Sequence, residues 1–556
     1  MAAACQAWAG APPAAEALAH RLDPDARPRD REALVRLYAG AQDRLLWSDG
    51  GRPTTQALAL LHELRLADER GLDPEDYPGN RLARQLVDLV DSPGPGSAAW
   101  ADFDVGLSYA ALRFLSDLHL GRIDPASVGH NLTVDRGAFD LPTALAHLAV
   151  AADVDAAVDA VEPQFEHYAL LKKQLGIYRE LAAEAGLNDL PPLPRRSVKP
   201  GEPYAGAAKL AHLLAAVGDL PPSGLPPSDS PPPESMTPAL VQALKAFQAR
   251  HGRKPDGALG ARTFAALTRP MAARVQQIEL TMERWRWLPA KLTSAPIVVN
   301  IPQFRLFAFE STEDSESRMV QMDVIVGKAF AATQTPVFTA DMTYLVFRPY
   351  WDVPYHIALK EIVPQARADP ASLEKHQMEI VRGPDDSAVV MPVTAANVDL
   401  VARGVLRVRQ RPGPNNALGL VKFMLPNSYN VYLHSTPARS LFAESRRDFS
   451  HGCIRVSDPV RLAEYVLRDS PEWDRDKILA AMDGPKSLTV PLRNRIRVFI
   501  VYGTAVALER GDILFFDDIY GHDARLWQAL QARRPRPQPR QVRNAPVSRW
   551  TKSDLR

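Results

Sequence analysis

One cysteine of this chain lies in a setting that can make it a nucleophile. Cys453 is one of only two cysteines in 556 residues, and it ends the run Ser450-His451-Gly452-Cys453. A thiol attacks as the thiolate, and because its free pKa is about 8.5 it needs a base or a positive field near neutral pH. His434, upstream of this run, and His451, within it, are the two candidate bases. These residue types therefore indicate nucleophilic catalysis by a cysteine.

The residues around the two histidines alternate as half-buried strands do. Residues 430–434 alternate polar and apolar side chains, which predicts a strand with His434 on its polar face. The same pattern in residues 451–455 places His451 and Cys453 together on one face. If the two segments are neighbouring strands, both histidines can reach the sulfur. The alternation alone leaves open which of them is the base.

Two less functional interpretations compete with a nucleophile. A buried cysteine is more often a small inert hydrophobic residue, and a zinc site would use the same residue types. One cysteine and two histidines lack the paired ligand spacing of structural zinc sites. The complete pattern H-x15-S-H-G-C is also far more specific than an isolated cysteine. In addition, Gly452 allows the backbone to approach a substrate carbonyl, so that the amides around Cys453 can form an oxyanion hole.

This pattern resembles the signature of the YkuD-type L,D-transpeptidases, in which a peptidoglycan stem peptide acylates a cysteine of a β-rich domain. Other stretches resemble the large multidomain, YcbB-like branch of Gram-negative bacteria. These stretches are Asn300–Leu306, Val326–Lys328, Gln334–Pro336, Pro349–Pro354, Arg409–Gly413, Asn416–Gly419 and Lys422–Phe423.

The resemblance implies a role for each candidate residue. Cys453 would be the nucleophile and His434 the general base, oriented by the backbone carbonyl of Ser435. Arg455 would either clamp a substrate carboxylate or form a surface salt bridge. The residues expected at the oxyanion and substrate sites are His451, Gly452, Arg455, Tyr432 and Ser450.

The reaction implied by the resemblance is formation of 3→3 cross-links in peptidoglycan through a cysteine acyl-enzyme on tetrapeptide stems. The same acyl-enzyme would also serve an L,D-carboxypeptidase, an endopeptidase or a lipoprotein-anchoring enzyme, and a protein of another class would be a non-catalytic cell-wall-binding scaffold. No metal or organic cofactor is expected, because thiolate, imidazole and amide donors suffice for acyl transfer. The expected partners are stem peptides and glycan, and the expected location is the periplasm or cell envelope of a Gram-negative bacterium.

Composition limits the class of protein. A chain of 556 residues is too long for one core and predicts about three or four domains. Its 66 Lys and Arg residues nearly balance its 65 Asp and Glu residues, so nothing in the net charge indicates nucleic acid as a partner. No run of about 18 apolar residues predicts a transmembrane helix. The oligomeric state stays open.

The pattern along the chain predicts a multidomain α+β protein. It consists of a helical scaffold domain, a small three-helix module that resembles the peptidoglycan-binding domain 1 family, and a β-rich L,D-transpeptidase catalytic domain with an inserted capping subdomain. The expected boundaries are 1–28 for a possible remnant of an export signal, 29–195 for the scaffold, 196–270 for the module, 271–528 for the catalytic domain with its insertion at about 355–408, and 529–556 for a basic, proline-rich tail.

Four further expectations concern the catalytic half and the module. Strand-like runs between residues 297 and 502 predict a sandwich or open barrel, and the insertion, rich in helix formers, predicts a lid. Ser457-Asp-Pro459 predicts a helix whose N-terminal dipole would help lower the pKa of the thiol. Thr237 and Pro238 predict the N-cap and first residue of a module helix. Whether the module grips glycan or only stiffens the molecule stays open.

Overall fold

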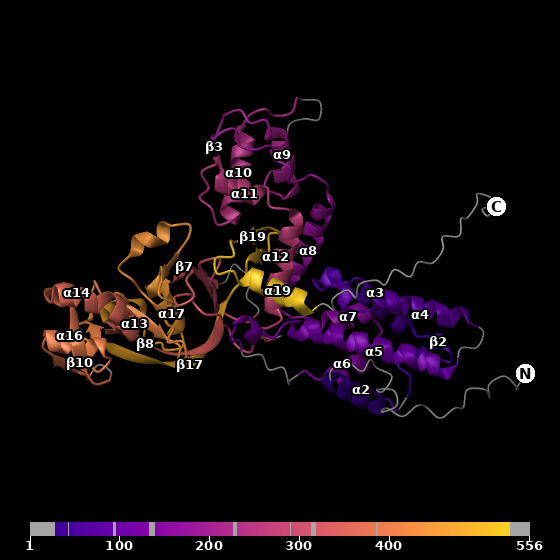
Figure 1. Ribbon diagram of the computed structural model, residues 1–556, viewed down its shortest axis with the longest axis horizontal. Helices are drawn as coiled ribbons and strands as arrows, with labels where there is room; N and C mark the ends of the chain where they lie inside the picture. The colour runs from indigo at the N-terminus through magenta and orange to yellow at the C-terminus, as the bar shows by residue number, and fades with distance from the viewer. Residues whose placement is uncertain are drawn as a thin grey trace, which may run out of the picture.

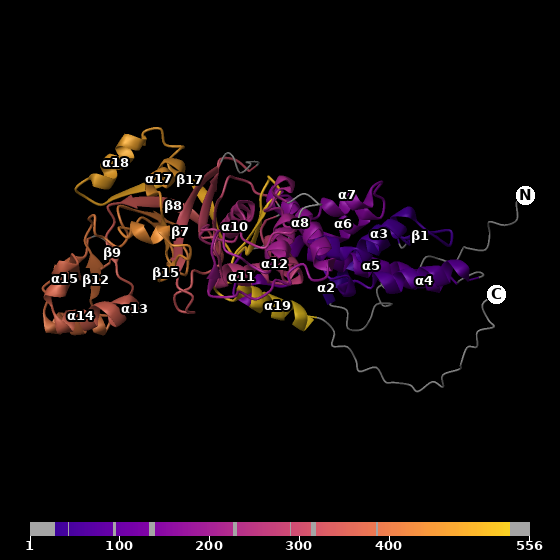
Figure 2. The same cartoon turned by 90° about the horizontal axis from the view of Figure 1, so that it is seen from above.

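The computed structural model describes residues 28–42, 44–92, 96–132, 139–225, 231–289, 291–312, 319–384 and 387–533. The expected N-terminal segment lies outside these residues, apart from Pro28, and so does the expected tail beyond Arg533. The described parts form an elongated molecule (Figures 1 and 2), with a mainly helical domain at one end, a small mixed subdomain at the other and a β-rich domain between them. A three-helix module projects from the middle of the molecule (Figure 1).

The helical domain surrounds one long central helix, α5. Asp104 of α5 is fully buried and accepts hydrogen bonds from Trp47 N at 2.8 Å, Leu46 N at 3.0 Å and Tyr38 Oη at 2.8 Å. A buried carboxyl group is tolerated when donors surround it in this way. The helices are α2 Pro28–Gly40, α3 Thr55–Arg65, α4 Gly79–Asp91, α5 Ser97–Leu120, α6 Leu141–Leu148 and α7 Val154–Asp159, with the hairpin β1 Ser48–Asp49 and β2 Arg52–Pro53 and the 3₁₀ turns η1 Ala67–Arg70, η2 Pro74–Asp76 and η3 Pro125–Val128.

The three-helix module shares its core with two long helices, α8 Glu166–Ala183 and α12 Met271–Trp285. As the sequence predicts, Thr237 caps the second module helix by accepting from Leu240 N at 3.3 Å, and Pro238 is the first helical residue. The module contains α9 Ala207–Ala216, η4 Pro222–Gly224, α10 Pro238–Arg250 and α11 Ala261–Leu267, joined by β3 Ser197–Val198 and β4 Leu259–Gly260.

The β-rich domain is a closed ring of strands rather than a sandwich or an open barrel. Its sheet runs in the order β15-β7-β16-β14-β13-β8-β17-β5-β6, and a further pairing of β6 with β7 closes it. The strands are β5 Ile297–Asn300, β6 Arg305–Phe309, β7 Met319–Gly327, β8 Phe338–Phe347, β13 Val421–Met424, β14 Leu433–His434, β15 Asp448–Ser450, β16 Ile454–Val456 and β17 Leu488–Val501. Closure leaves few strand edges unpaired.

Two helices, α17 Pro459–Val466 and α18 Arg475–Asp483, pack on the barrel and share its core. The helix expected after Ser457 is α17, with Asp458 as its N-cap and Pro459 as its first residue. The short 3₁₀ turn η7 Arg439–Ala443 lies between β14 and β15.

The insertion folds as a subdomain with its own core. The helix formers in its sequence account for only part of its secondary structure. It also contains a four-stranded sheet in the order β11-β10-β12-β9, which the sequence reading missed because the strands are short. Its elements are β9 Trp351–Asp352, α13 Tyr355–Ile357, the π-helical turn η6 Ala358–Ile362, α14 Val363–Ala368, α15 Ala371–Lys375, β10 Met378–Arg382, β11 Val389–Met391, α16 Ala395–Ala402 and β12 Arg407–Gln410.

The last described segment returns to the middle of the molecule (Figure 1). The hairpin β18 Ala505–Ala507 and β19 Ile513–Phe515 packs in the core of the module and α12, and α19 His522–Arg533 packs against η3 and α12. The expected start of the tail at residue 529 is therefore wrong, because α19 continues to Arg533. The Arg533 guanidinium donates to both carboxylate oxygens of Asp117, at 2.8 and 3.0 Å. Within the described residues, the helices are too short or too polar to cross a bilayer.

Candidate active site

The two segments that carry the candidate catalytic residues are neighbouring strands. β14 and β16 pair in parallel, with Leu433 opposite Ile454 and His434 opposite Arg455. The strand expected over residues 451–455 begins only at Ile454, because Gly452 turns the chain with a φ of +120°. Cys453 therefore lies at the mouth of the barrel, where the turn enters β16.

One face of the sheet collects the polar side chains. Arg455 of β16, His434 of β14, Lys422 of β13 and Val346 of β8 are successive partners across the four strands. Paired residues on neighbouring strands point to the same side of a sheet. The opposite face belongs to the barrel core. Arg455, His434 and Lys422 therefore share this face with Val346. Lys422 lies outside the two sequence segments, 430–434 and 451–455, whose alternation predicted strands.

His434 is held as a neutral base. It is 4% exposed, and its Nδ1 lies 2.6 Å from the carbonyl oxygen of Ser435. A carbonyl oxygen only accepts hydrogen bonds, so Nδ1 carries the proton and Nε2 of the neutral ring is free of one. Burial, followed by the charge of Arg455, lowers the pKa of His434 to about 3. The ring is therefore neutral, with Nε2 unprotonated, at any pH near neutrality.

A glycine allows a second loop to pack against this histidine. Gly419 has a φ of +62°, and a Cβ there would lie 2.5 Å from Ser435 Oγ and 2.7 Å from Thr436 N. No side chain fits that space. The preceding carbonyl of Leu418 also interacts with His434 and favours its protonated form. This close packing fixes the imidazole ring from the side of the Asn416–Gly419 loop.

The thiol of Cys453 is partly covered and protonated. Its Sγ donates to the carbonyl oxygen of Asn430 at 3.7 Å. Burial raises the pKa of the thiol, although hydrogen bonds from Tyr432 and the charge of Arg455 oppose this effect. The net pKa of the thiol is therefore raised, because desolvation outweighs the favourable hydrogen bonds and charge. The expected contribution of the dipole of the following helix stays a prediction. A protonated thiol needs a base to remove its proton as it attacks.

An asparagine shapes the loop that brings Asn430 to the thiol. The Asn427 side chain donates to Val431 O at 2.7 Å and accepts from Tyr429 N at 2.9 Å. Asn430 itself has a φ of +54°, a left-handed conformation that asparagine tolerates better than most residues. These local bonds explain why a polar loop keeps a defined position beside the sulfur.

Two sets of hydrogen bonds hold the turn before Cys453 in place, one within the turn and one from a neighbouring segment. Inside the turn, Ser450 Oγ donates to Cys453 O at 2.6 Å and accepts from Gly452 N at 3.1 Å. Outside it, the fully buried Thr335 donates through Oγ1 to Gly452 O at 2.8 Å and accepts from Gly327 N at 2.8 Å. Ser450, expected near the substrate, is 2% exposed and engaged within the turn.

His451 faces the capping subdomain. Its Nε2 lies 3.0 Å from Glu361 Oε1 in η6, so one residue of the insertion contacts the turn that carries the cysteine. This contact engages the ring nitrogen that a base would use and makes His451 the weaker candidate. By contrast, Arg455 forms no ion pair with any residue that the structure describes, and its buried Nε has no hydrogen-bond partner among them. The salt-bridge interpretation of Arg455 is thus not supported.

Comparison with known proteins identifies the β-rich domain. Residues 295–485 match the model of the L,D-transpeptidase catalytic domain (YkuD). This part of the chain is an L,D-transpeptidase catalytic domain. Residues 32–175 match a scaffold domain and residues 209–267 match the model described as "Putative peptidoglycan binding domain". The protein therefore combines a helical scaffold, a peptidoglycan-binding module and a β-rich L,D-transpeptidase domain.

A curated relative has the same catalytic description. The chain is 30% identical over 251 residues to a Haemophilus influenzae protein named "Putative L,D-transpeptidase". The alignment covers 45% of this chain and 49% of the relative, so the chain spans about half the length of the curated relative that it matches.

Three residues around the L,D-transpeptidase site were not singled out from the sequence. Thr335, Lys422 and Glu361 carry no local pattern that predicts their roles, because each meets the site only through the strand pairing or the packing of the insertion. Thr335 and Lys422 do lie inside two of the stretches that resemble the multidomain branch. Those stretches were the available signal.

We expect Thr335→Val to slow acylation of Cys453 by about 10- to 100-fold, because the turn would lose the hydroxyl that bonds Gly452 O and a small misplacement of a nucleophile has an effect of that size. Intact-protein mass spectrometry of the acyl-enzyme measures this rate. Thr335→Ser keeps the hydroxyl and should retain most of the activity. Equal rates for the two variants would show that Thr335 does not position the turn.

Proposed function

We propose that this protein forms 3→3 cross-links in peptidoglycan through a thioester on Cys453. The observation that supports the proposal is that the strand carrying the neutral His434 lies beside the strand that begins directly after Cys453, and that Ser435 O orients the ring so that Nε2 is the basic atom. The thiol is protonated, and general-base activation requires a neutral base close to such a nucleophile. No metal or organic cofactor takes part in the proposed reaction.

In the first half-reaction, Cys453 Sγ attacks the carbonyl carbon of the L-centre of meso-diaminopimelate in a tetrapeptide stem. His434 Nε2 takes the thiol proton as the carbon–sulfur bond forms. The backbone amide of Cys453 holds the developing oxyanion, because the amide of Gly452 already donates to Ser450 Oγ. The intermediate collapses to a thioester when His434 returns the proton to the departing nitrogen, and terminal D-alanine leaves.

In the second half-reaction, the side-chain amine of a second stem attacks the thioester. His434 takes the amine proton and returns it to the sulfur as the thioester breaks, so the thiol is regenerated and a new amide joins the two stems. Stem peptides carry several carboxylates, and the basic side chains of Lys422 and Arg455 lie on the face where the stems would bind. In this proposal Arg455 clamps one of these carboxylates, and Tyr432 contacts the substrate beside the sulfur.

The wider assignment follows the resemblance of the chain. A scaffold, a peptidoglycan-binding module and a catalytic domain with a capping insertion fit a member of the multidomain branch that works in the periplasm of a Gram-negative bacterium. Glycan and stem peptides would then be its partners.

The test is to incubate purified protein with disaccharide-tetrapeptide muropeptides and to identify the products by mass spectrometry. We expect dimers formed with loss of one alanine, and none from Cys453→Ala. Tripeptide monomers alone would assign hydrolysis in place of transpeptidation. No change in any muropeptide would favour a non-catalytic cell-wall scaffold.

The acidic limb of the pH profile tests the state of His434. Because its pKa in the folded protein is about 3, the base form persists as the pH falls from 7 to 5, and acylation should change little over that range. A histidine with an ordinary pKa of about 6.5 would lose roughly 30-fold by pH 5. We would measure kcat/KM for acylation between pH 4 and 8. A midpoint near 6.5 would contradict the neutral, buried base.

A further inference from the structure

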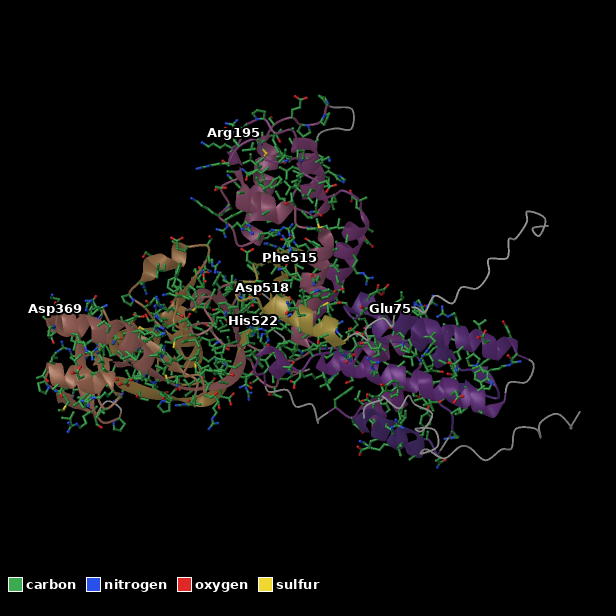
Figure 3. The ribbon with its side chains drawn as sticks, in the orientation of Figure 1. Glu75, Arg195, Asp369, Phe515, Asp518 and His522 are labelled. Carbon is green, nitrogen blue, oxygen red and sulfur yellow. The ribbon has the colours of Figure 1, made fainter. Side chains whose placement is uncertain are left out.

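A cavity of about 160 Å³ lies where the peptidoglycan-binding module meets the segment after β19. Phe515, at the end of β19, marks the position at the base of the module (Figure 3). A space of this size admits several waters or a small ligand group. The cavity is lined by His251, Arg253, Ala265, Ala266, Arg269, Arg274, Phe515 and Asp517, none of which belongs to the site around Cys453.

The charges in this cavity do not balance. Three guanidinium groups, from Arg253, Arg269 and Arg274, face it, and Asp517 is the single carboxylate in its lining. Asp517 is itself 61% exposed and shared between Arg253 Nη2, at 3.2 Å, and Arg262 Nη2, at 4.0 Å. At least two of the lining arginines therefore have no carboxylate partner in the cavity.

Arg274 carries the strongest part of the argument. It is 6% exposed, yet among the described residues its guanidinium donates only to neutral oxygens, Gln277 Oε1 at 3.1 Å and Ala266 O at 3.0 Å. It also stacks over the Phe515 ring, at 4.6 Å from its centroid. Burial and the neighbouring charge of Arg269 lower the pKa of Arg274 to about 9. Proteins ordinarily pair buried charges, so an arginine in this position is suited to an anion that arrives from outside.

The other two arginines supply donors. Arg253 Nε is buried and has no hydrogen-bond partner among the described residues. Arg269 forms neither a side-chain hydrogen bond nor an ion pair within the part of the chain that the structure describes. Guanidinium groups present fixed pairs of donors that match carboxylate and phosphate oxygens. Arg253 and Arg269 therefore supply two sets of donors around Arg274. Of these two, only Arg253 has a carboxylate partner, Asp517, among the described residues.

The remaining walls favour a small ligand group over a long chain. His251 donates through Nδ1 to Phe247 O at 2.7 Å, and burial lowers the pKa of its ring, so Nε2 is an acceptor for a hydroxyl or amide of the ligand. Phe515 and two alanines make the rest of the wall apolar. The cavity combines a cationic end with an apolar wall, as sites for small organic acids do.

We propose that this cavity binds the oxyanion of a small acidic group, and that the bearer is a carboxylate of a peptidoglycan stem peptide. The choice of bearer rests on the proposed function, whereas the oxyanion site rests on the three arginines alone. A stem held here would dock the wall on the module at a point separate from Cys453, and the module would then contribute to substrate capture.

The test uses the full chain with Cys453→Ala, which cannot turn over substrate. Isothermal titration calorimetry in a phosphate-free buffer would compare the stem tripeptide, its fully amidated form and inorganic phosphate. Arg269→Gln in this background should weaken tripeptide binding about tenfold or more, the effect of losing a charge-assisted hydrogen bond. Arg195→Gln is the matched control, because Arg195 lies beside the same module, is 60% exposed, pairs with Glu202 and does not line the cavity.

Hydrogen exchange would show where on the protein the tripeptide binds. In the control variant, the tripeptide should slow exchange in residues 262–277, and this protection should disappear in Arg269→Gln. If phosphate binds and the tripeptide does not, the oxyanion site is supported but the stem peptide is rejected as its ligand. Equal affinity in the two arginine variants, or no binding of any probe at millimolar concentration, would overturn the site. Because the measurement needs no catalysis, binding here with no product from muropeptides would reject only the proposed reaction.

Discussion

Replacing His434 by asparagine is expected to slow acylation of Cys453 by about 10²- to 10⁴-fold, the usual contribution of a positioned general base. Asparagine can still donate to Ser435 O from the position of Nδ1, so the contact that holds the residue survives while the basic Nε2 atom is lost. The thiol has a raised pKa, so without a base it has no route to the thiolate near neutral pH. Stopped-flow or quenched mass spectrometry of the acyl-enzyme measures the rate.

His451→Gln is the matched control for this prediction. Glutamine places an amide where Nε2 of His451 contacts Glu361, so the link to the capping subdomain can persist. We expect this variant to acylate within about 10-fold of the parent protein. Fast acylation in His434→Asn together with a large loss in His451→Gln would reverse the assignment of the base.

The sequence predicted the strands of the site but not the electrostatics around it. Alternation over residues 430–434 and 451–455 is a local property that predicted two strands, and the structure pairs β14 with β16, although the second strand begins only at Ile454. The pKa of the thiol is not local. It depends on how deeply the turn is buried by parts of the chain far away in sequence, so the following helix alone could not predict its net direction.

Long-range pairing explains the other omissions. Thr335 bonds Gly452, 117 positions away in the sequence, and Glu361 contacts His451, 90 positions away. No local pattern around Thr335 or Glu361 predicts these contacts. The closure of the barrel by β6 and β7 depends likewise on the shape of the whole sheet. By contrast, the cap at Thr237 and the first residue Pro238 depend on a few adjacent residues, and the structure confirms both.

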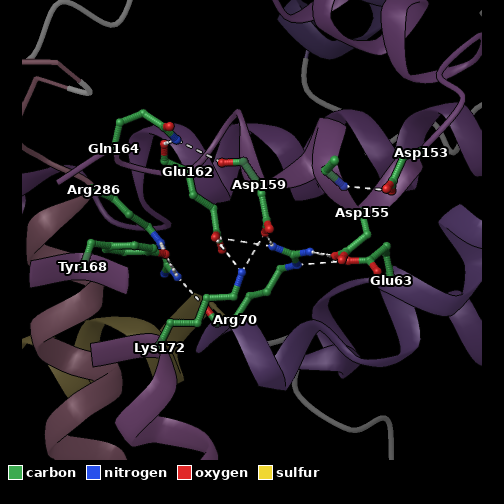
Figure 4. A network of polar contacts seen from close by, with 11 residues as sticks. Glu63, Arg70, Asp153, Asp155, Asp159, Glu162, Gln164, Tyr168, Lys172 and Arg286 are labelled. Carbon is green, nitrogen blue, oxygen red and sulfur yellow. Dashed lines mark hydrogen bonds and ion pairs between the residues drawn. The ribbon is translucent and has the colours of Figure 1, made fainter. Parts of the chain in front are cut away.

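The strongest structural prediction concerns the buried charges that join the helical scaffold to α12, the helix that leads into the catalytic domain. Glu283 of α12 is fully buried and accepts hydrogen bonds from Ile123 N at 3.1 Å, Arg122 Nε at 3.1 Å and Arg286 Nη1 at 3.3 Å. Arg286 continues the network to Tyr168 Oη, at 2.9 Å, and towards the cluster around Arg70 (Figure 4). Arginines on both sides hold the pKa of Glu283 below its usual value despite its burial.

We expect Glu283→Ala to lower the free energy of unfolding of this region by about 3–5 kcal/mol, because Arg122 and Arg286 would stay buried without a carboxylate. Denaturant unfolding, with hydrogen exchange to localise the change to α12 and the loop after α5, measures the loss. Glu374→Ala is the control, since Glu374 is 76% exposed and its ion pair with Arg411 should contribute at most about 1 kcal/mol. Similar losses in both variants would show that the buried carboxylate does not hold the junction. A large loss confined to Glu283→Ala would show that the stability of this junction depends on one buried carboxylate.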